Sequence, residues 1–141
     1  MTVRTCTASP GAASKVRMAE TLLYVDDNLS RLEVMHARLS QLGYEVITAA
    51  NGVEALKLFT ENYVDLAIVD YYMPGMSGDL VAMEMKCIRP EIPVIIFSGT
   101  FTLSEMVVAF VDGFVSTSDE PEALVNKIAE IMNAGRSAKA S

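Results

Sequence analysis

Several residue types that would point to particular classes of protein are scarce in this chain of 141 residues. It has no tryptophan, one histidine and two cysteines, so neither a disulfide framework nor a His/Cys zinc site is indicated. No apolar run approaches the roughly 20 residues that a membrane helix needs. The 11 Lys and Arg residues are scattered and outnumbered by 18 Asp and Glu, for a net charge of −7. We therefore expect no nucleic-acid partner, no membrane partner and a reducing, cytoplasmic environment.

The two ends of the chain differ in composition from the middle. Residues 1–19 are rich in Thr, Ala and Ser and contain no acidic residue. That composition superficially suits a transit peptide, but a flexible tail, or a true start at Met18, is the simpler interpretation. Residues 134–141 are also small and polar. We predict flexible tails over 1–19 and 134–141, and one folded domain over 20–133.

Between these tails, short apolar runs alternate with segments of helical periodicity. Strands are predicted at Thr21–Val25, Tyr44–Thr48, the run that ends at Asp70, Pro93–Phe97 and Asp112–Ser116. Helices are predicted after Asn28 with Ser30 and Glu33 as a capping box, from Asn51, from Ser77 or Asp79 to about Ile88, at Leu103–Phe110 and from Pro121. The periodicity assigns inner faces to Leu32, Met35, Leu39 and Leu42; Val53, Leu56 and Phe59; Leu80, Met83 and Cys87; and Leu124, Ile128 and Ile131.

Five strands alternating with five helices predict an α/β fold with a five-stranded parallel sheet and helices on both faces. Right-handed crossovers favour the strand order 2-1-3-4-5, with strands 1 and 3 adjacent. Strand 1 then delivers Asp26 and Asp27, and strand 3 delivers Asp70, to one edge of the sheet. Strands 4 and 5 bring Ser98 and Thr117 to the same edge.

Three carboxylates in one pocket repel one another unless a proton or a cation neutralises them. An all-oxygen set of ligands suits Mg²⁺ or Mn²⁺ better than zinc. An Asp beside such an ion can also act as a nucleophile and become an aspartyl phosphate. Each acid taken alone could instead cap a helix or start a turn, as acids often do. For three acids at adjacent strand ends, the shared site is the better interpretation.

Three segments together resemble a known family. Tyr24-Val25-Asp26-Asp27-Asn28, the segment from Asp70 to Gly78 with its Asp-x-x-Met-Pro-x-Met-x-Gly pattern, and Phe97-Ser98-Gly99 look like the receiver domain of two-component response regulators. The resemblance covers about Thr21 to Met132. It implies a flavodoxin-like, receiver-type fold, and part of the support for the strand order comes from it, because a family member is a known example of that order.

The resemblance also implies roles for individual residues. Asp70 would accept a phosphoryl group from the phosphohistidine of a partner. Ser98 would contact a phosphoryl oxygen, and Phe114 matches an aromatic switch position, although a plain core Phe is an equally good interpretation. The Mg²⁺ or Mn²⁺ ligands would be Asp26 through water, Asp27, Asp70 and the backbone carbonyl of Tyr72.

One position departs from the family pattern. Receivers carry a Lys at the end of strand 5, and the aligned residue here is Thr117. An acyl phosphate carries a charge of about −2, and Thr117 offers a hydroxyl but no positive charge. Without the Lys, this count leaves the phosphorylated pocket one unit more negative than in the family. We therefore expect slower or weaker phosphorylation, or a changed coupling between phosphate and output.

The leading hypothesis is a single-domain response regulator, phosphorylated on Asp70 in a phosphorelay and signalling through protein contacts. Its partners would be a sensor histidine kinase or histidine phosphotransfer protein and a downstream protein target. The alternative is a pseudo-receiver, a binding module that switches without phosphorylation. Enzymatic activity would at most extend to self-phosphorylation from, and hydrolysis of, an acyl phosphate. A separate phosphatase activity is disfavoured because Tyr72 stands where such enzymes need a second Asp.

Overall fold

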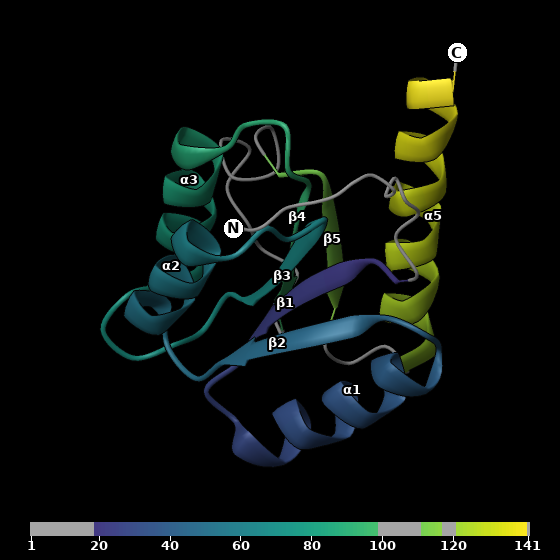
Figure 1. Ribbon diagram of the computed structural model, residues 1–141. Helices are drawn as coiled ribbons and strands as arrows, with labels where there is room; N and C mark the ends of the chain where they lie inside the picture. The colour runs from purple at the N-terminus through teal and green to yellow at the C-terminus, as the bar shows by residue number, and fades with distance from the viewer. Residues whose placement is uncertain (1–18, 99–110, 117–120, 141) are drawn as a thin grey trace.

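A computed structural model of the chain describes residues 19–98, 111–116 and 121–140. Within them, the strands form one parallel sheet in the order β2-β1-β3-β4-β5, which confirms the predicted order (Figure 1). The strands are β1 (Thr21–Val25), β2 (Glu45–Ala49), β3 (Leu66–Asp70), β4 (Val94–Ser98) and β5 (Gly113–Ser116). β2, β4 and β5 each begin one residue later than predicted, and β2 and β4 also end one residue later.

Helices cover both faces of the sheet, as predicted (Figure 1). They are α1 (Leu29–Gln41), α2 (Gly52–Glu61), α3 (Gly78–Ile88) and α5 (Pro121–Ala140). α2 and α3 pack on one face and α1 and α5 on the other, which gives two separate hydrophobic clusters. The helix predicted at Leu103–Phe110 lies outside the described residues. No helix in the described part of the chain is long and apolar enough to cross a membrane.

Two interior strands, β3 and β4, explain why the sheet could be predicted from the sequence. All five residues of β3 and all five of β4 are buried. A parallel strand covered on both faces reads as a continuous apolar run rather than an alternating one. The polar residues that end these runs, Asp70 and Ser98, therefore lie at the carboxyl edge of the sheet, where α/β proteins place their ligands.

The first helix begins earlier than predicted. Asn28 is its N-cap, and the Asn28 side-chain oxygen accepts a hydrogen bond from the Arg31 backbone N–H at 3.1 Å. The capping box assigned to Ser30 and Glu33 is therefore wrong, because those residues lie inside the first turns of α1. Asn28 follows directly after Asp26 and Asp27, so only three residues separate the end of β1 from the start of α1.

Several predicted inner-face residues are exposed instead. They are Leu42, Val53, Leu80, Met83 and Cys87, whereas Gly52, Ala55, Val81, Ala82 and Met85 are buried in their helices. α2 and α3 pack very closely: a Cβ on Gly52 would lie 2.8 Å from Cγ2 of Val81. The face of α3 that carries Val81, Ala82 and Met85 therefore packs inward, and the face that carries Leu80, Met83 and Cys87 lies outside.

At the C-terminus, α5 continues to Ala140 and so extends into the predicted tail, which begins at residue 134. A helix therefore occupies most of the segment that we expected to fray. The division of the chain into one domain and two tails stays a prediction.

Arg89 links the end of α2 to the end of α3. Its guanidinium donates to the carbonyl oxygens of Phe59 at 2.5 Å, Asn62 at 3.2 Å and Thr60 at 3.1 Å, and lies 5.2 Å from the centre of the Phe59 ring. A cation at a helix C-terminus also interacts favourably with the helix dipole.

We expect Arg89→Ala to lower the free energy of unfolding by about 2 kcal/mol, because three hydrogen bonds from a charged donor, two of them partly buried, are lost. Arg38→Ala is the matched control: Arg38 makes an exposed ion pair with Glu122, worth at most about 1 kcal/mol. Urea denaturation of both variants measures the difference. Equal effects would show that Arg89 is only a surface residue.

Candidate functional site

Three acidic residues meet where β1 and β3 end side by side. Val25 lies opposite Val69 in the strand register, so Asp26 and Asp70 follow as neighbours. Carboxylate oxygens of Asp26, Asp27 and Asp70 lie within 4.8 Å of one another. Asp26 and Asp70 are 0% and 4% exposed, and Asp27 is exposed. The structure thus brings together the acids that the strand order predicts; their roles stay a proposal.

Asp26 is surrounded by hydrogen-bond donors. Its Oδ1 accepts from the backbone N–H of Asn28 at 2.9 Å and from Arg31 Nη2 at 3.1 Å. Its Oδ2 accepts from Arg31 Nε at 2.5 Å and from the Tyr24 hydroxyl at 3.2 Å. A carboxylate has about four lone-pair positions. Asp26 therefore has little capacity left for a direct metal bond, which fits a role through water.

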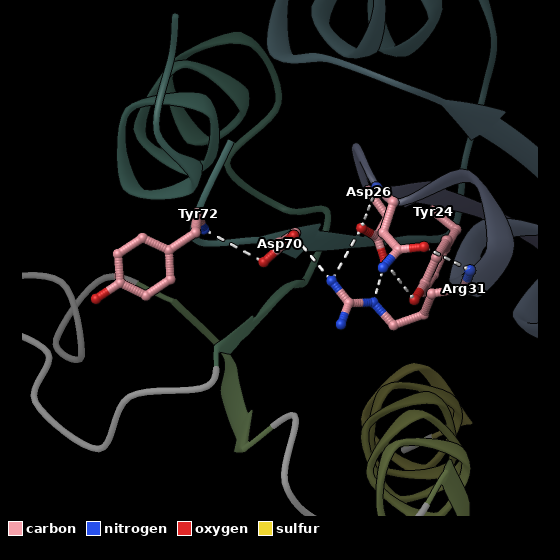
Figure 2. Close-up of polar contacts among 6 residues, drawn as sticks. Tyr24, Asp26, Arg31, Asp70 and Tyr72 are labelled. Atoms are coloured by element: carbon pink, nitrogen blue, oxygen red, sulfur yellow. Dashed lines mark hydrogen bonds and ion pairs between the residues drawn. The ribbon is translucent and has the colours of Figure 1, made fainter. Parts of the chain in front are cut away.

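Arg31 brings a positive charge into the pocket that the sequence-based charge count omitted. Besides its two bonds to Asp26, its Nη2 lies 3.2 Å from Asp70 Oδ2. Figure 2 shows the guanidinium between the two carboxylates. The inference that no cation compensates the pocket is therefore wrong, because a residue of α1 supplies one. The hydrogen bond to Asp26 raises the pKa of Arg31 above its usual value, so the side chain is charged.

Asp70 has an unusual ionisation equilibrium. Burial, followed by the negative charge of Asp26, raises its pKa from 3.8 to about 7. The Tyr72 backbone N–H, which donates to Asp70 Oδ1 at 3.2 Å, and the charge of Arg31 act in the opposite direction. Burial also raises the pKa of the Tyr24 phenol, so this hydroxyl remains a donor to Asp26. A cation that binds beside a buried carboxyl with a raised pKa strongly favours its ionised form.

The other predicted site residues are placed unevenly. Ser98 is buried at the end of β4, one position past the residue paired with Asp70. Phe114 is partly buried in β5 and packs against the core under α2 and α3, which leaves both of its predicted roles open. The Tyr72 side chain is 59% exposed, and the metal-binding role of its carbonyl stays a prediction. Thr117 lies outside the described residues.

The acidic cluster is chemically suited to a hard divalent cation. Its ligand atoms are all carboxylate oxygens, and one of the acids, Asp27, is open to solvent. Mg²⁺ prefers such ligands together with several retained waters. If the ion binds here, Asp27 and Asp70 would hold it directly and Asp26 would act through water, as the sequence predicts. The donor set thus fits the ion, although Arg31 already contacts Asp70.

The loop after β3 approaches its own strand very closely. The Gly78 N–H donates to the Tyr71 carbonyl at 2.8 Å. A Cβ on Gly78 would lie 2.3 Å from the Asp70 carbonyl oxygen and 2.7 Å from the Tyr71 Cα. Gly75, at the turn of the same loop, has φ of +86° and open space around it. Only glycine at position 78 therefore lets the start of α3 lie this close to the backbone of Asp70.

Sequence reasoning missed Arg31, although a signal for it exists. A cation in the first turn of a helix opposes the helix dipole and is disfavoured there unless an acid pairs with it. Arg31 lies in that turn, and the strand-ending Asp26 comes five positions earlier. A basic residue at this spacing from a buried acid could have been tested as its partner.

Comparisons with known proteins agree with this geometry. The sequence profile described as the response regulator receiver domain matches residues 22–129. The probable transcriptional regulator ycf27 of Cyanidium caldarium is 35% identical over 114 residues, which are 79% of this chain and 45% of that protein. The transcriptional regulatory protein GlrR of Escherichia coli K12 is 35% identical over 100 residues, 71% of this chain and 22% of that protein. This chain thus spans less than half of their length.

Solved structures match over nearly their whole length. A receiver domain protein from Methanospirillum hungatei superposes with a TM-score of 0.78 at 26% identity, covering 85% of this chain and 98% of that one. The response regulator TrrA from Thermotoga maritima, solved in complex with Mg(2+)-BeF, superposes with a TM-score of 0.74 at 33% identity, covering 79% of this chain and 97% of that one.

Proposed function

The chain belongs to the response regulator receiver family, with a role in two-component signalling, and from that premise we propose that Asp70 is its phosphoacceptor. The donor would be the phosphohistidine of a sensor histidine kinase or a histidine phosphotransfer protein. The phosphorylated domain would then act on a downstream protein in the cytoplasm. The observation that carries the proposal is the buried Asp70 carboxylate at the end of the central strand, with Asp26 and Asp27 beside it.

The chemistry is a phosphoryl transfer between a nitrogen and an oxygen. An Asp70 carboxylate oxygen bonds to phosphorus as the phosphorus–nitrogen bond of the donor breaks. The electron pair of that bond returns to the imidazole ring, which takes up a proton from solvent if it leaves unprotonated. A bound divalent cation offsets the negative charge of the carboxylates and of the phosphoryl oxygens during such a transfer. Ser98, which ends β4 at the same edge of the sheet, would contact a phosphoryl oxygen.

The ionisation of Asp70 fits a cation-dependent acceptor. With a pKa of about 7 in the metal-free protein, Asp70 is protonated in a sizeable fraction of molecules at neutral pH. A protonated carboxyl is a poor nucleophile, so an added cation would favour the reactive form. The complex of TrrA with Mg(2+)-BeF supports the use of Mg²⁺ at a receiver site of this kind.

A second candidate is the pseudo-receiver, which would switch without phosphorylation. Arg31 favours it, because its contact with Asp70 already satisfies part of the negative charge of the pocket. The family Lys is also replaced by Thr117. That this receiver signals as a single domain stays a prediction of the first proposal. The relatives named transcriptional regulators are more than twice as long as the part that aligns with this chain.

Phosphate uptake separates the two candidates. We expect the wild type, incubated with Mg²⁺ and acetyl phosphate, to gain the mass of one phosphoryl group, and Asp70→Asn to gain none. Asp79→Asn, a nearby acid that accepts a hydrogen bond from Ser77, is the matched control and should react like the wild type. Hydroxylamine should remove the added group, because acyl phosphates are cleaved by it. No uptake by the wild type, even with a cognate kinase, would favour the pseudo-receiver.

A further inference from the structure

Arg31 is held in place from several sides. Its backbone N–H is bonded to the N-cap Asn28, and its guanidinium makes a two-point contact with Asp26. The guanidinium carbon also lies 5.5 Å from the centre of the Phe97 ring, which in turn stacks on Tyr24. A planar guanidinium held by a bidentate carboxylate and an aromatic ring loses little further freedom when it binds another group.

The contacts of Arg31 with the two acids differ in strength. Asp26 takes two nitrogens at 2.5 and 3.1 Å, whereas Asp70 is reached by Nη2 alone at 3.2 Å. When a divalent cation binds Asp70, its charge repels the nearby guanidinium. The single Asp70 contact can then break while the Asp26 contacts remain. Arg31 would stay beside Asp70 after releasing it.

Nη2, still bonded to Asp26 but no longer to Asp70, would face the position where a phosphoryl group is attached. Its partner in the structure is Asp70 Oδ2, one of the two oxygens that can form the bond to phosphorus. Guanidinium groups bind phosphoryl oxygens well, because their donors match the geometry of the anion. The positive charge of Arg31 would therefore compensate the charge that phosphorylation adds.

We propose that Arg31 is the counter-cation of this pocket: it holds Asp70 in the metal-free protein, yields Asp70 to the divalent cation, and then pairs with the phosphoryl group on Asp70. In this role it replaces the Lys that the family carries where this chain has Thr117. The last step rests on the proposed function of Asp70, whereas the competition with the metal does not.

The proposal predicts two effects of Arg31→Gln with opposite signs. Magnesium should bind roughly tenfold more tightly or better, because a competing positive charge within a few ångström of the metal ligands is removed. Phosphorylation by acetyl phosphate at saturating Mg²⁺ should slow by roughly tenfold or more, because a cation next to the transferring phosphoryl group is lost. A purely structural residue would weaken both properties together.

The experiment measures both properties on the full chain. Calorimetric titration with Mg²⁺ alone gives the dissociation constant, and intact mass against time gives the initial rate of phosphorylation. Arg31→Lys keeps the positive charge but lacks the planar guanidinium with its paired donors, and it should recover most of the phosphorylation rate. Arg38→Gln, further along α1 and paired with Glu122, is the matched control and should leave both quantities unchanged. Far-ultraviolet circular dichroism confirms that each variant is folded.

Each outcome decides a part of the proposal. Unchanged Mg²⁺ affinity in Arg31→Gln would show that Arg31 does not occupy the pocket in solution. Tighter Mg²⁺ binding with an unchanged or faster rate would leave Arg31 as a competitor only and overturn its contact with the phosphoryl group. If the wild type takes up no phosphate at all, the proposed function fails together with that contact, and the Mg²⁺ titration alone decides the competition.

Discussion

Alanine in place of Gly78 is expected to lower the free energy of unfolding by about 2–4 kcal/mol and to abolish phosphate uptake on Asp70. The added Cβ would lie 2.3 Å from the Asp70 carbonyl oxygen, 2.7 Å from the Tyr71 Cα and 2.9 Å from the Asp70 carbonyl carbon. All three are backbone atoms, so no side chain can rotate away to relieve the contact. Either the start of α3 or the end of β3 must move, and both changes displace the acceptor.

Two other glycines serve as controls for this variant. Gly43 and Gly75 have φ of +100° and +86°, and a Cβ at either position would have no heavy atom within 4 Å beyond the glycine and its two chain neighbours. Alanine at either position should cost only about 1–2 kcal/mol of backbone strain. Urea denaturation and intact mass after acetyl phosphate treatment read out stability and uptake. If Gly78→Ala is no less stable than Gly43→Ala and still reacts, the close approach at Gly78 is unimportant.

The second large effect concerns Asp70 itself: at pH 8 without divalent cations, Asp70→Asn should be more stable than the wild type by about 2–4 kcal/mol. The pKa of Asp70 is about 7 in the folded protein and 3.8 as the ordinary value, so the folded state binds more protons between these pH values. Unfolding therefore becomes easier as pH rises through this window. Roughly three pKa units, at about 1.4 kcal/mol each, amount to about 4 kcal/mol above pH 7.

The difference in unfolding free energy between the wild type and Asp70→Asn, measured against pH, reports on the Asp70 carboxyl alone, because the other titrating groups are common to both proteins. In EDTA, the advantage of Asp70→Asn at about pH 5 should be less than half of its value at about pH 8, because most of the window lies above pH 5. Magnesium should stabilise the wild type more than the variant and shrink the difference. Glu61→Gln, which removes an exposed charge at the end of α2, is the control for net charge. An advantage that is absent at pH 8, or equal at both pH values, contradicts the raised pKa of Asp70.

The sheet and its acidic edge were predictable because each depends on a local pattern. β3 and β4 are buried over their whole length, so their apolar runs and the polar residues that end them are visible in the sequence. The crossover rule limits the possible strand orders, and together with the family resemblance it favours 2-1-3-4-5, which brings Asp26 next to Asp70. Strand limits were off by a residue, because Ala49 and Ser98 continue the ladder although their side chains give no strand signal.

Contacts that depend on tertiary packing were not predictable in the same way. α3 carries two apolar stripes, and its buried one contains Val81 and Ala82 because α2 lies so close at Gly52. Periodicity alone cannot choose between two such stripes. Arg31 was missed for a related reason: its partner Asp70 is 39 positions away, and only the register of β1 and β3 brings the two together.

The pairing of Asp26 with Arg31 also has a consequence for protein engineering. Both partners lie in one short stretch of chain, the turn from β1 into α1, and the N-cap Asn28 that sets their spacing lies between them. The Lys of the family pattern, which aligns with Thr117, would instead come from a distant part of the sequence. The positive charge of this pocket can therefore be transferred with one short segment. Exchanging residues 26–31 between related domains would move the buried acid Asp26, the helix N-cap Asn28 and the cation Arg31 together.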